Sequence, residues 1–103
     1  MIYYMNDKKR YEQKIADVKQ ALCELGRIHP GSVTKQKQAR GSGYYYLSYS
    51  FKGEGHTLYV REEDLDQVRE EVENYRTFRS LINRCVDLEI EYSRLRRGKK
   101  SSS

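Results

Sequence analysis

Apolar residues recur along the first part of the chain at intervals of four and three positions. The members of this stripe are Tyr11, Ile15, Val18, Leu22 and Leu25. This spacing places them on one side of an α-helix, which turns once in about 3.6 residues. We predict a helix over about residues 7–25. Asn6 or Asp7 is expected to cap its start, and Gly26 is expected to end it in a left-handed conformation.

A longer stripe with the same spacing runs through the last third of the chain. Its members are Leu65, Val68, Val72, Tyr75, Phe78, Ile82, Cys85, Leu88, Tyr92 and Leu95. Acidic residues crowd the first turns, so we predict that this helix starts at about residue 62. Some 35 residues at about 1.5 Å each give a helix of roughly 50 Å, longer than a small domain is wide. Part of it is therefore expected to pack against the first helix, a second copy of the chain or a partner.

Between the two helical stretches the sequence changes to residues that favour β-strands. Residues 44–51 read YYYLSYSF, residues 52–55 supply the glycines of a turn, and residues 56–60 form a returning strand. Residues 33–40 are polar with weak alternation, which predicts a loop or a short edge strand. The expected fold class is α+β. It comprises an N-terminal helix, a β-hairpin with or without a third short strand, and a long C-terminal helix packing against the first helix.

Alternation along the strands assigns the hairpin residues to two faces. The face predicted to be core contains Tyr45, Leu47, Tyr49, Phe51, Leu58 and Val60. The other face contains Tyr44, Tyr46, Ser48, Ser50 and Tyr59. The chain has ten tyrosines but only two phenylalanines and no tryptophan. Tyrosine combines apolar area with a hydroxyl that needs water or a partner, so the second face is a candidate binding surface.

The length of 103 residues leaves room for one domain, which we predict over residues 1–97. Residues 98–103 are expected to form a flexible basic, serine-rich tail. The net charge of +5 is unevenly distributed. Residues 26–61 carry six basic residues and one acidic residue, whereas residues 62–93 carry four basic and ten acidic residues. The basic residues therefore concentrate in the hairpin region and in the tail, and the acidic helix lies between these two regions in the sequence.

Catalytic and metal chemistry find little support in the sequence. The only histidines, His29 and His56, belong to no recognisable motif, so we predict no enzyme, no cofactor and no metal site. Cys23 and Cys85 lack Cys-x-x-Cys spacing and are expected to be buried free thiols. No apolar run approaches the roughly 20 residues of a membrane span, and the N-terminus lacks a signal-peptide pattern. A cytoplasmic protein without a membrane partner is expected.

Basic and aromatic residues gather around the hairpin. Basic side chains neutralise phosphates, and aromatic rings stack on unpaired bases. We predict a nucleic-acid-binding surface composed of Lys35, Lys37, Arg40, Tyr44, Tyr46, Tyr59 and Arg61. Its ligand would be DNA or RNA, and a two-stranded ribbon can also enter a major groove.

Two sequence blocks are specific in combination, YYYLSY at residues 44–49 and ENYRTF at residues 73–78. They resemble a family of small uncharacterised bacterial and archaeal proteins with a GPYYYLSY-type hairpin and an ENYRRF-type helix, often found near transposases in mobile elements. The resemblance covers about residues 11–95 and implies a mobile-element or phage context. Many members carry a cysteine cluster before the tyrosines. This chain has VTKQKQAR there, which argues against metal binding.

Two functions follow from these features as hypotheses. The first is a non-enzymatic nucleic-acid-binding accessory protein of a mobile genetic element or phage. The alternative is a protein–protein interaction module or inhibitor, for example an anti-CRISPR-like protein. Such a module would dock on a larger nucleoprotein complex through the hairpin and the long helix. The long helix is also the expected surface for a homodimer.

Overall fold

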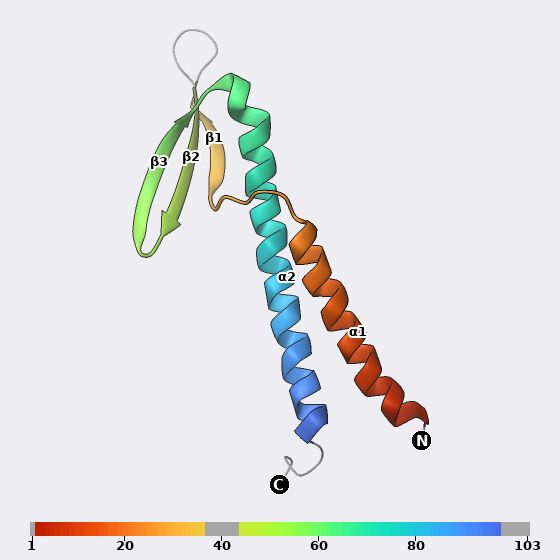
Figure 1. The fold of residues 1–103 in the computed structure, drawn as a ribbon. Helices are drawn as coiled ribbons and strands as arrows, with labels where there is room; N and C mark the ends of the chain where they lie inside the picture. The colour runs from red at the N-terminus through yellow and green to blue at the C-terminus, as the bar shows by residue number, and fades with distance from the viewer. Residues whose placement is uncertain (1, 37–43, 98–103) are drawn as a thin grey trace. The chain divides into compact units, whose positions relative to one another are not determined.

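The computed structural model describes the backbone of residues 2–36 and 44–97, and the side chains of residues 7–35 and 44–97. Its elements are α1 (Ile2–Glu24), β1 (Ser32–Gln36), β2 (Tyr44–Phe51), β3 (Glu54–Val60), a 3-10 turn (Glu62–Asp64) and α2 (Leu65–Arg97), as Figure 1 shows. The predicted α+β class is confirmed, as is the packing of the long C-terminal helix on the first helix.

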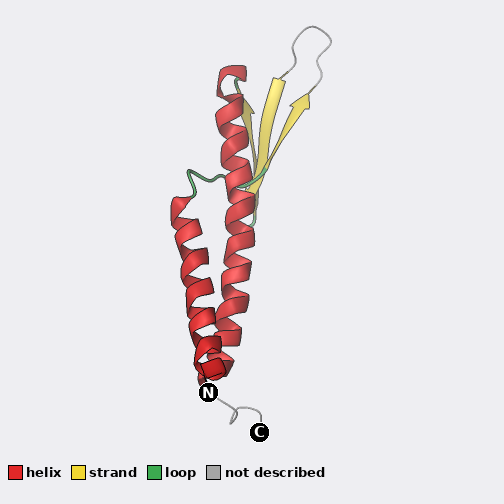
Figure 2. Ribbon diagram, turned by 90° about the vertical axis from the view of Figure 1, so that its right-hand side faces the viewer, coloured by secondary structure: helices red, strands yellow, loops and turns green. Residues whose placement is uncertain are grey.

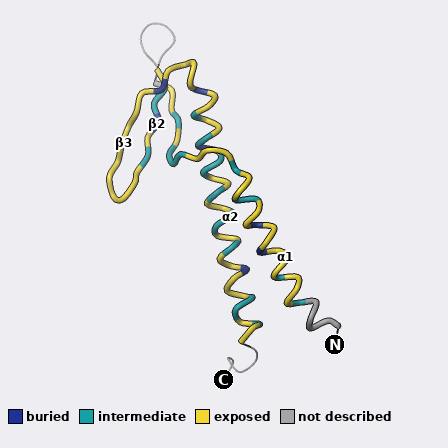
Figure 3. Tube along the Cα trace, in the orientation of Figure 1, coloured by how far each residue is buried: buried dark blue, intermediate teal, exposed yellow. Residues whose placement is uncertain are grey.

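The chain divides into two compact units, and α2 contributes to both. The helical unit consists of Met1–Leu25 and Phe78–Ser103, and the sheet unit consists of Gly26–Thr77. Each unit has its own cluster of buried apolar residues. Figure 3 shows these buried positions along the Cα trace. The tail predicted at residues 98–103 lies outside the described residues.

In the helical unit, α1 lies alongside the second part of α2 (Figure 1). Ile15, Val18 and Leu88 are buried between the two helices, and five further residues pack on them: Tyr11, Leu22, Leu81, Cys85 and Tyr92. All except Leu81 are members of the predicted stripes. Burying one such aliphatic side chain contributes about 1.5–3 kcal/mol, so this seam is the main stabilising feature of the unit.

The predicted start of the first helix was wrong, whereas its predicted end at about residue 25 agrees with the observed end at Glu24. Because α1 already begins at Ile2, Asn6 and Asp7 lie within the helix and do not cap it. No glycine or proline interrupts the preceding residues, so the helix extends through them. Gly26 does follow the helix end, but it does not adopt the left-handed conformation. A Cβ there would lie 3.3 Å from Nδ2 of Asn74. The glycine therefore lets the backbone approach α2 closely.

The three strands form one antiparallel sheet in the order β1-β2-β3 (Figure 2). Lys52 and Gly53 make a two-residue turn, with φ values of 51° and 81° that suit a tight hairpin connection. The predicted hairpin is confirmed, although its turn is shorter than expected because Glu54 and Gly55 belong to β3. Of the two alternatives for residues 33–40, the structure has the short edge strand, at Ser32–Gln36.

One face of the sheet, here called the inner face, packs against the first part of α2. Its core consists of Leu47, Val60, Leu65 and Val72, with Val33, Tyr45, Tyr49 and Val68 packed around it. The prediction that Phe51 and Leu58 belong to this core was wrong, since they are 58% and 45% exposed. Phe51 adjoins the hairpin turn and Leu58 lies on an edge strand. The core cluster between the sheet and α2 includes neither of these two residues, which lie at the rim of the sheet.

The connection into β1 depends on Gly31. Its φ is 119°, and a Cβ there would lie 2.4 Å from the Ser48 carbonyl oxygen. Only glycine fits this position without movement of β2. The segment is also held by a hydrogen bond from the His29 backbone N–H to the Glu71 carbonyl, at 3.1 Å.

Both cysteines are free thiols, as predicted. Cys85 is half-buried in the seam between the helices, but Cys23 is exposed. The expectation of burial was wrong for Cys23 because this residue follows Leu22 by one position. One step along a helix rotates a side chain by about 100°, away from the stripe.

Candidate nucleic-acid interface

The outer face of the sheet, opposite the inner face, carries hydroxyl groups at most of its positions. Strand register places Tyr46 directly opposite Tyr59, and Thr34 opposite Tyr46 on the other side. We call this surface the tyrosine face. Its described side chains are Ser32, Thr34, Tyr44, Tyr46, Ser48, Ser50, Thr57 and Tyr59. None of these side chains is charged, and each can donate and accept a hydrogen bond.

Three tyrosines of this face contact one another. The ring of Tyr59 meets Tyr44 at a centroid distance of 5.7 Å and Tyr46 at 6.1 Å, with interplanar angles of 64° and 66°. Edge-to-face packing of this kind is favourable and restricts the rotamers of all three rings. Tyr44 and Tyr59 are nevertheless 46% and 57% exposed. The sheet therefore presents two exposed aromatic rings to solvent, and the half-buried ring of Tyr46 lies beside Tyr59.

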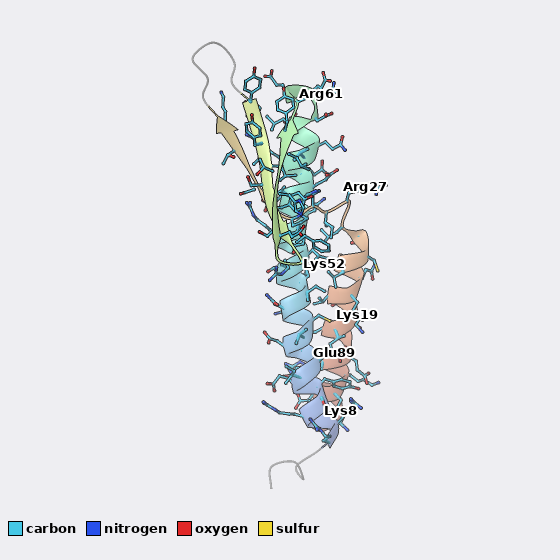
Figure 4. The ribbon with its side chains drawn as sticks, turned by 90° about the vertical axis from the view of Figure 1, so that its left-hand side faces the viewer. Lys8, Lys19, Arg27, Lys52, Arg61 and Glu89 are labelled. Carbon is cyan, nitrogen blue, oxygen red and sulfur yellow. The ribbon has the colours of Figure 1, made fainter. Side chains whose placement is uncertain are left out.

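Arg61 lies at one end of the tyrosine face. It follows β3 directly, and Val60 is paired with Tyr45, so Arg61 is near the start of β2. Figure 4 shows it at the opposite end of the hairpin from Lys52. Its Nη1 is 3.2 Å from Oε2 of Glu63, in an exposed ion pair. Such a pair contributes little and can exchange Glu63 for another anion.

Lys35 lies on the inner face, away from the three tyrosines. It is paired with Tyr45, and its Nζ is 5.8 Å from the centre of the Tyr45 ring. The sequence did not show that residues 32–36 form a strand, so it could not assign this lysine to a face of the sheet. The structure thus groups Tyr44, Tyr46, Tyr59 and Arg61, and it separates Lys35 from them. Lys37 and Arg40 lie outside the described residues and stay predictions.

Ser32, Thr34 and Thr57 also belong to the tyrosine face, although they were not predicted to. Alternation along the predicted returning strand could have assigned Thr57 to this face, because Thr57 precedes the inner-face residue Leu58. Ser32 and Thr34 could be assigned only once residues 32–36 were known to form a strand. With them included, the face is a broad hydroxyl surface, wider than a pair of strands.

The two histidines have structural contacts to the same ring. The His29 ring meets Tyr49 edge-on at 4.7 Å, and His56 stacks on Tyr49 at 4.9 Å. His29 Nδ1 also forms a 2.8 Å hydrogen bond with the Pro30 carbonyl oxygen. Across the described part of the chain, no cluster of three or more His, Cys, Asp or Glu side chains is arranged to hold a metal ion.

Within the described residues, neither α1 nor α2 has a stretch that is both long enough and apolar enough to cross a membrane. Comparisons with known protein families, with curated proteins and with solved structures find no match for this chain. The function of the tyrosine face must therefore be inferred from its own side chains.

Proposed function

We propose that the protein binds single-stranded nucleic acid through the tyrosine face and catalyses no reaction. The observation that carries this proposal is the aromatic triplet of Tyr44, Tyr46 and Tyr59, of which Tyr44 and Tyr59 are exposed. Unpaired bases stack on aromatic side chains, and each such contact contributes about 1–3 kcal/mol. Because the rings already restrain one another, little conformational entropy is lost when a base stacks on them.

A single strand fits this face better than a duplex. The base faces of a duplex are occupied by neighbouring bases, so an aromatic platform has nothing to stack on. Duplex binding depends mainly on phosphate contacts from lysine and arginine, and the described tyrosine face contains neither. A similar use of a sheet occurs in RNA-recognition modules, which stack two or three bases on aromatic strand residues. That parallel is an analogy between surfaces.

Phosphates would be contacted from the end of the face. Arg61 is placed there, and Lys37 and Arg40 belong to the segment that connects Gln36 to Tyr44 in the sequence. The serine and threonine hydroxyls supply hydrogen bonds to bases and sugars. The resemblance to proteins found near transposases supports a role as a cytoplasmic accessory protein of a mobile element.

The test is a fluorescence anisotropy titration at low salt with labelled 12-nucleotide single-stranded DNA, single-stranded RNA and the matching DNA duplex. Tyr59→Ala should weaken binding to single strands about tenfold or more, because a stacking partner is lost. Tyr59→Phe should retain most of the affinity, since the ring remains. A wild-type protein that binds none of these strands would refute the proposal.

Phe51→Ala is the matched control for Tyr59→Ala. Phe51 is an equally exposed aromatic residue of the same hairpin, but it belongs to the inner face. Its removal should leave the affinity within about twofold. If Phe51→Ala and Tyr59→Ala weaken binding equally, the tyrosine face is not the binding surface.

A protein partner is the second candidate function, and the composition of the same face favours it. The antigen-binding loops of antibodies are rich in tyrosine and serine. Tyrosine offers them rigid contact area, and serine offers adaptable hydrogen bonds. The lack of charge on this face also agrees with protein binding. The salt dependence of a measured interaction separates the two functions, since phosphate binding weakens steeply as salt rises.

A further inference from the structure

An open hollow lies on the inner side of the sheet unit, beside β1. It has a volume of about 300 Å³ and is lined by Val33, Arg69, Val72, Glu73 and Arg76. One of these residues comes from β1 and four from the first part of α2. The hollow therefore follows the junction between an edge strand and a helix.

The floor of the hollow is apolar and its rim is cationic. Val72 is buried and Val33 is half-buried, whereas Arg69 and Arg76 lie one turn before and one turn after Val72 on α2. Arg69 and Lys35 both approach the Tyr45 ring, each with its charged group 5.8 Å from the ring centre. Arg69, Arg76 and Glu73 thus line the hollow around the two valines, and a third cation, Lys35, lies nearby at the Tyr45 ring.

Within the described part of the chain, two cations, Lys35 and Arg69, have no carboxylate partner, although the structure has several ion pairs elsewhere. Arg76 pairs with Glu73 at 3.1 Å, and both side chains are largely exposed. An exposed pair of this kind is weak enough for an incoming carboxylate to replace Glu73. The hollow is therefore complementary to an acidic ligand.

The neighbouring backbone adds a second recognition element. β1 stands at the edge of the sheet and, among the described strands, pairs only with β2. An edge strand presents unpaired N–H and C=O groups that an extended peptide can match. The strand contains no proline and no bulge in its register with β2 to block such pairing.

We infer that β1 and the hollow bind an extended acidic peptide of a partner protein as an added strand. Alternate side chains of that strand point into the hollow. A central apolar side chain covers Val33 and Val72, and the acidic side chains two positions before and after it reach the flanking cations. Arg69 and Arg76 are about 10 Å apart along the helix axis, and residues i and i+4 of a strand are about 13 Å apart. The length of the arginine side chains covers the difference.

Other occupants fit these residues less well. A second copy of β1 would bring its own Lys35 against the same cationic rim, where like charges repel. A nucleic-acid backbone would place charged phosphates over the apolar floor of Val33 and Val72. The hollow lies on the opposite side of the sheet from the rings of the tyrosine face, so the peptide is not expected to cover those rings.

The probe is the fluorescein-labelled peptide Thr-Asp-Thr-Val-Thr-Glu-Thr, which has acid, apolar and acid side chains at alternate positions. Saturable binding to the full chain is expected, measured by anisotropy at low salt. A peptide with lysine in place of both acids should bind at least about tenfold more weakly. Chemical-shift changes of backbone amides should concentrate in residues 32–36 and 69–76. Absence of saturable binding by the acidic peptide would overturn the inference.

Charge reversal tests the site itself. Arg69→Glu should weaken peptide binding about tenfold or more, because a charge-assisted contact becomes a repulsive one. Lys52→Glu makes the same charge change at the hairpin turn of the same unit, outside the hollow, and should leave the affinity within about twofold. Equal losses in the two variants would show only a general charge effect and overturn the assignment.

Competition with single-stranded DNA separates this site from the tyrosine face. A 12-nucleotide strand should not displace the peptide, and Tyr59→Ala should not change peptide affinity. Displacement by the oligonucleotide would mean that the hollow is a phosphate site and would refute peptide recognition. The proposed function of the tyrosine face would still be tested separately by its own titration.

Discussion

Tyr45 and Tyr46 are neighbours in the sequence, yet they lie on faces of the sheet with different roles. Tyr45 packs against the core cluster and has two cations, Lys35 and Arg69, beside its ring. Tyr46 joins Tyr59 in the aromatic triplet of the uncharged outer face. Aromatic and basic residues that are close together in the sequence therefore need not form one surface. Here the two kinds of side chain separate, with the described basic residues on the inner face or at the ends.

The largest expected effect concerns the core of the inner face. Leu47 is only 3% exposed, and Leu47→Ala should lower the free energy of unfolding by about 2–5 kcal/mol, because it leaves a cavity under α2. Chemical denaturation of the variant measures this loss. Phe51→Ala, on the same strand and face, should cost less than about 1 kcal/mol. Similar losses for both would contradict the assignment of Phe51 to an uncovered rim.

The entry into the sheet provides the next prediction. Gly31→Ala should destabilise the protein by about 1–3 kcal/mol, since its positive φ and the nearby Ser48 carbonyl both oppose a side chain. Gly55→Ala is the matched control, because nothing lies within 4 Å of a Cβ at that position. That control should leave stability unchanged or slightly higher. Thermal unfolding of both variants is the measurement, and equal melting temperatures would refute the prediction.

The neighbouring tyrosines allow a direct separation of stability from binding. Tyr45→Ala should reduce stability by about 2 kcal/mol or more through lost core packing, since truncating a well-packed aromatic side chain costs up to about 3–5 kcal/mol. Tyr46→Ala should instead weaken binding of single strands by about tenfold, with a smaller loss of stability. Denaturation and anisotropy titration of the same two variants measure both quantities. If Tyr45→Ala, still folded, loses more binding than Tyr46→Ala, the proposed roles of the faces are reversed.

The smallest expected effect lies in the helical unit and depends on pH. The Tyr92 hydroxyl donates a hydrogen bond to Glu12, and this bond, with further contributions from partial desolvation and the Glu12 charge, raises the pKa of Tyr92 above its usual value of 10.0. The folded state therefore holds this proton more tightly than the unfolded state. The associated stability is present below pH 10 and is lost as the pH rises through the folded-state pKa.

A difference titration isolates this group. The ultraviolet absorbance of the wild type minus that of Tyr92→Phe should show one tyrosine that ionises above pH 10. Glu12→Gln removes the charged acceptor and should move this ionisation back towards the usual pKa. An ionisation at or below pH 10 in the wild-type difference curve would show that the hydrogen bond does not hold the proton in solution.

Much of the fold was predictable because its patterns are local. The stripes of both helices, the hairpin and the alternation that separates Tyr45 from Tyr46 all follow from spacings of two, three or four residues. The start of α1 was missed because Asn6 and Asp7 are good capping residues, and their presence says nothing about whether the helix continues upstream. Phe51 and Leu58 were wrongly assigned to the core because alternation predicts which face of the sheet a residue is on. It does not show how much of that face a helix covers.

The candidate surfaces were predictable to different extents. Tyr44, Tyr46 and Tyr59 were assigned to one face from alternation within the hairpin, and the register bears this out. Lys35 was grouped with them because it is near in the sequence, and only the pairing of β1 with β2 places it on the other face. The hollow could not be foreseen at all, since Val33 and Arg69 are 36 positions apart and neither belongs to a motif.

The sequence by itself determined the elements of this protein, their order and the division of the hairpin into two faces, because these depend on the periodicity of neighbouring residues. The tertiary structure decided which face is covered, where the basic side chains lie relative to the tyrosines, and that an open hollow with two arginines lies between β1 and α2. Those features depend on strand register and on contacts between distant segments, and side-chain spacing along one element does not contain that information.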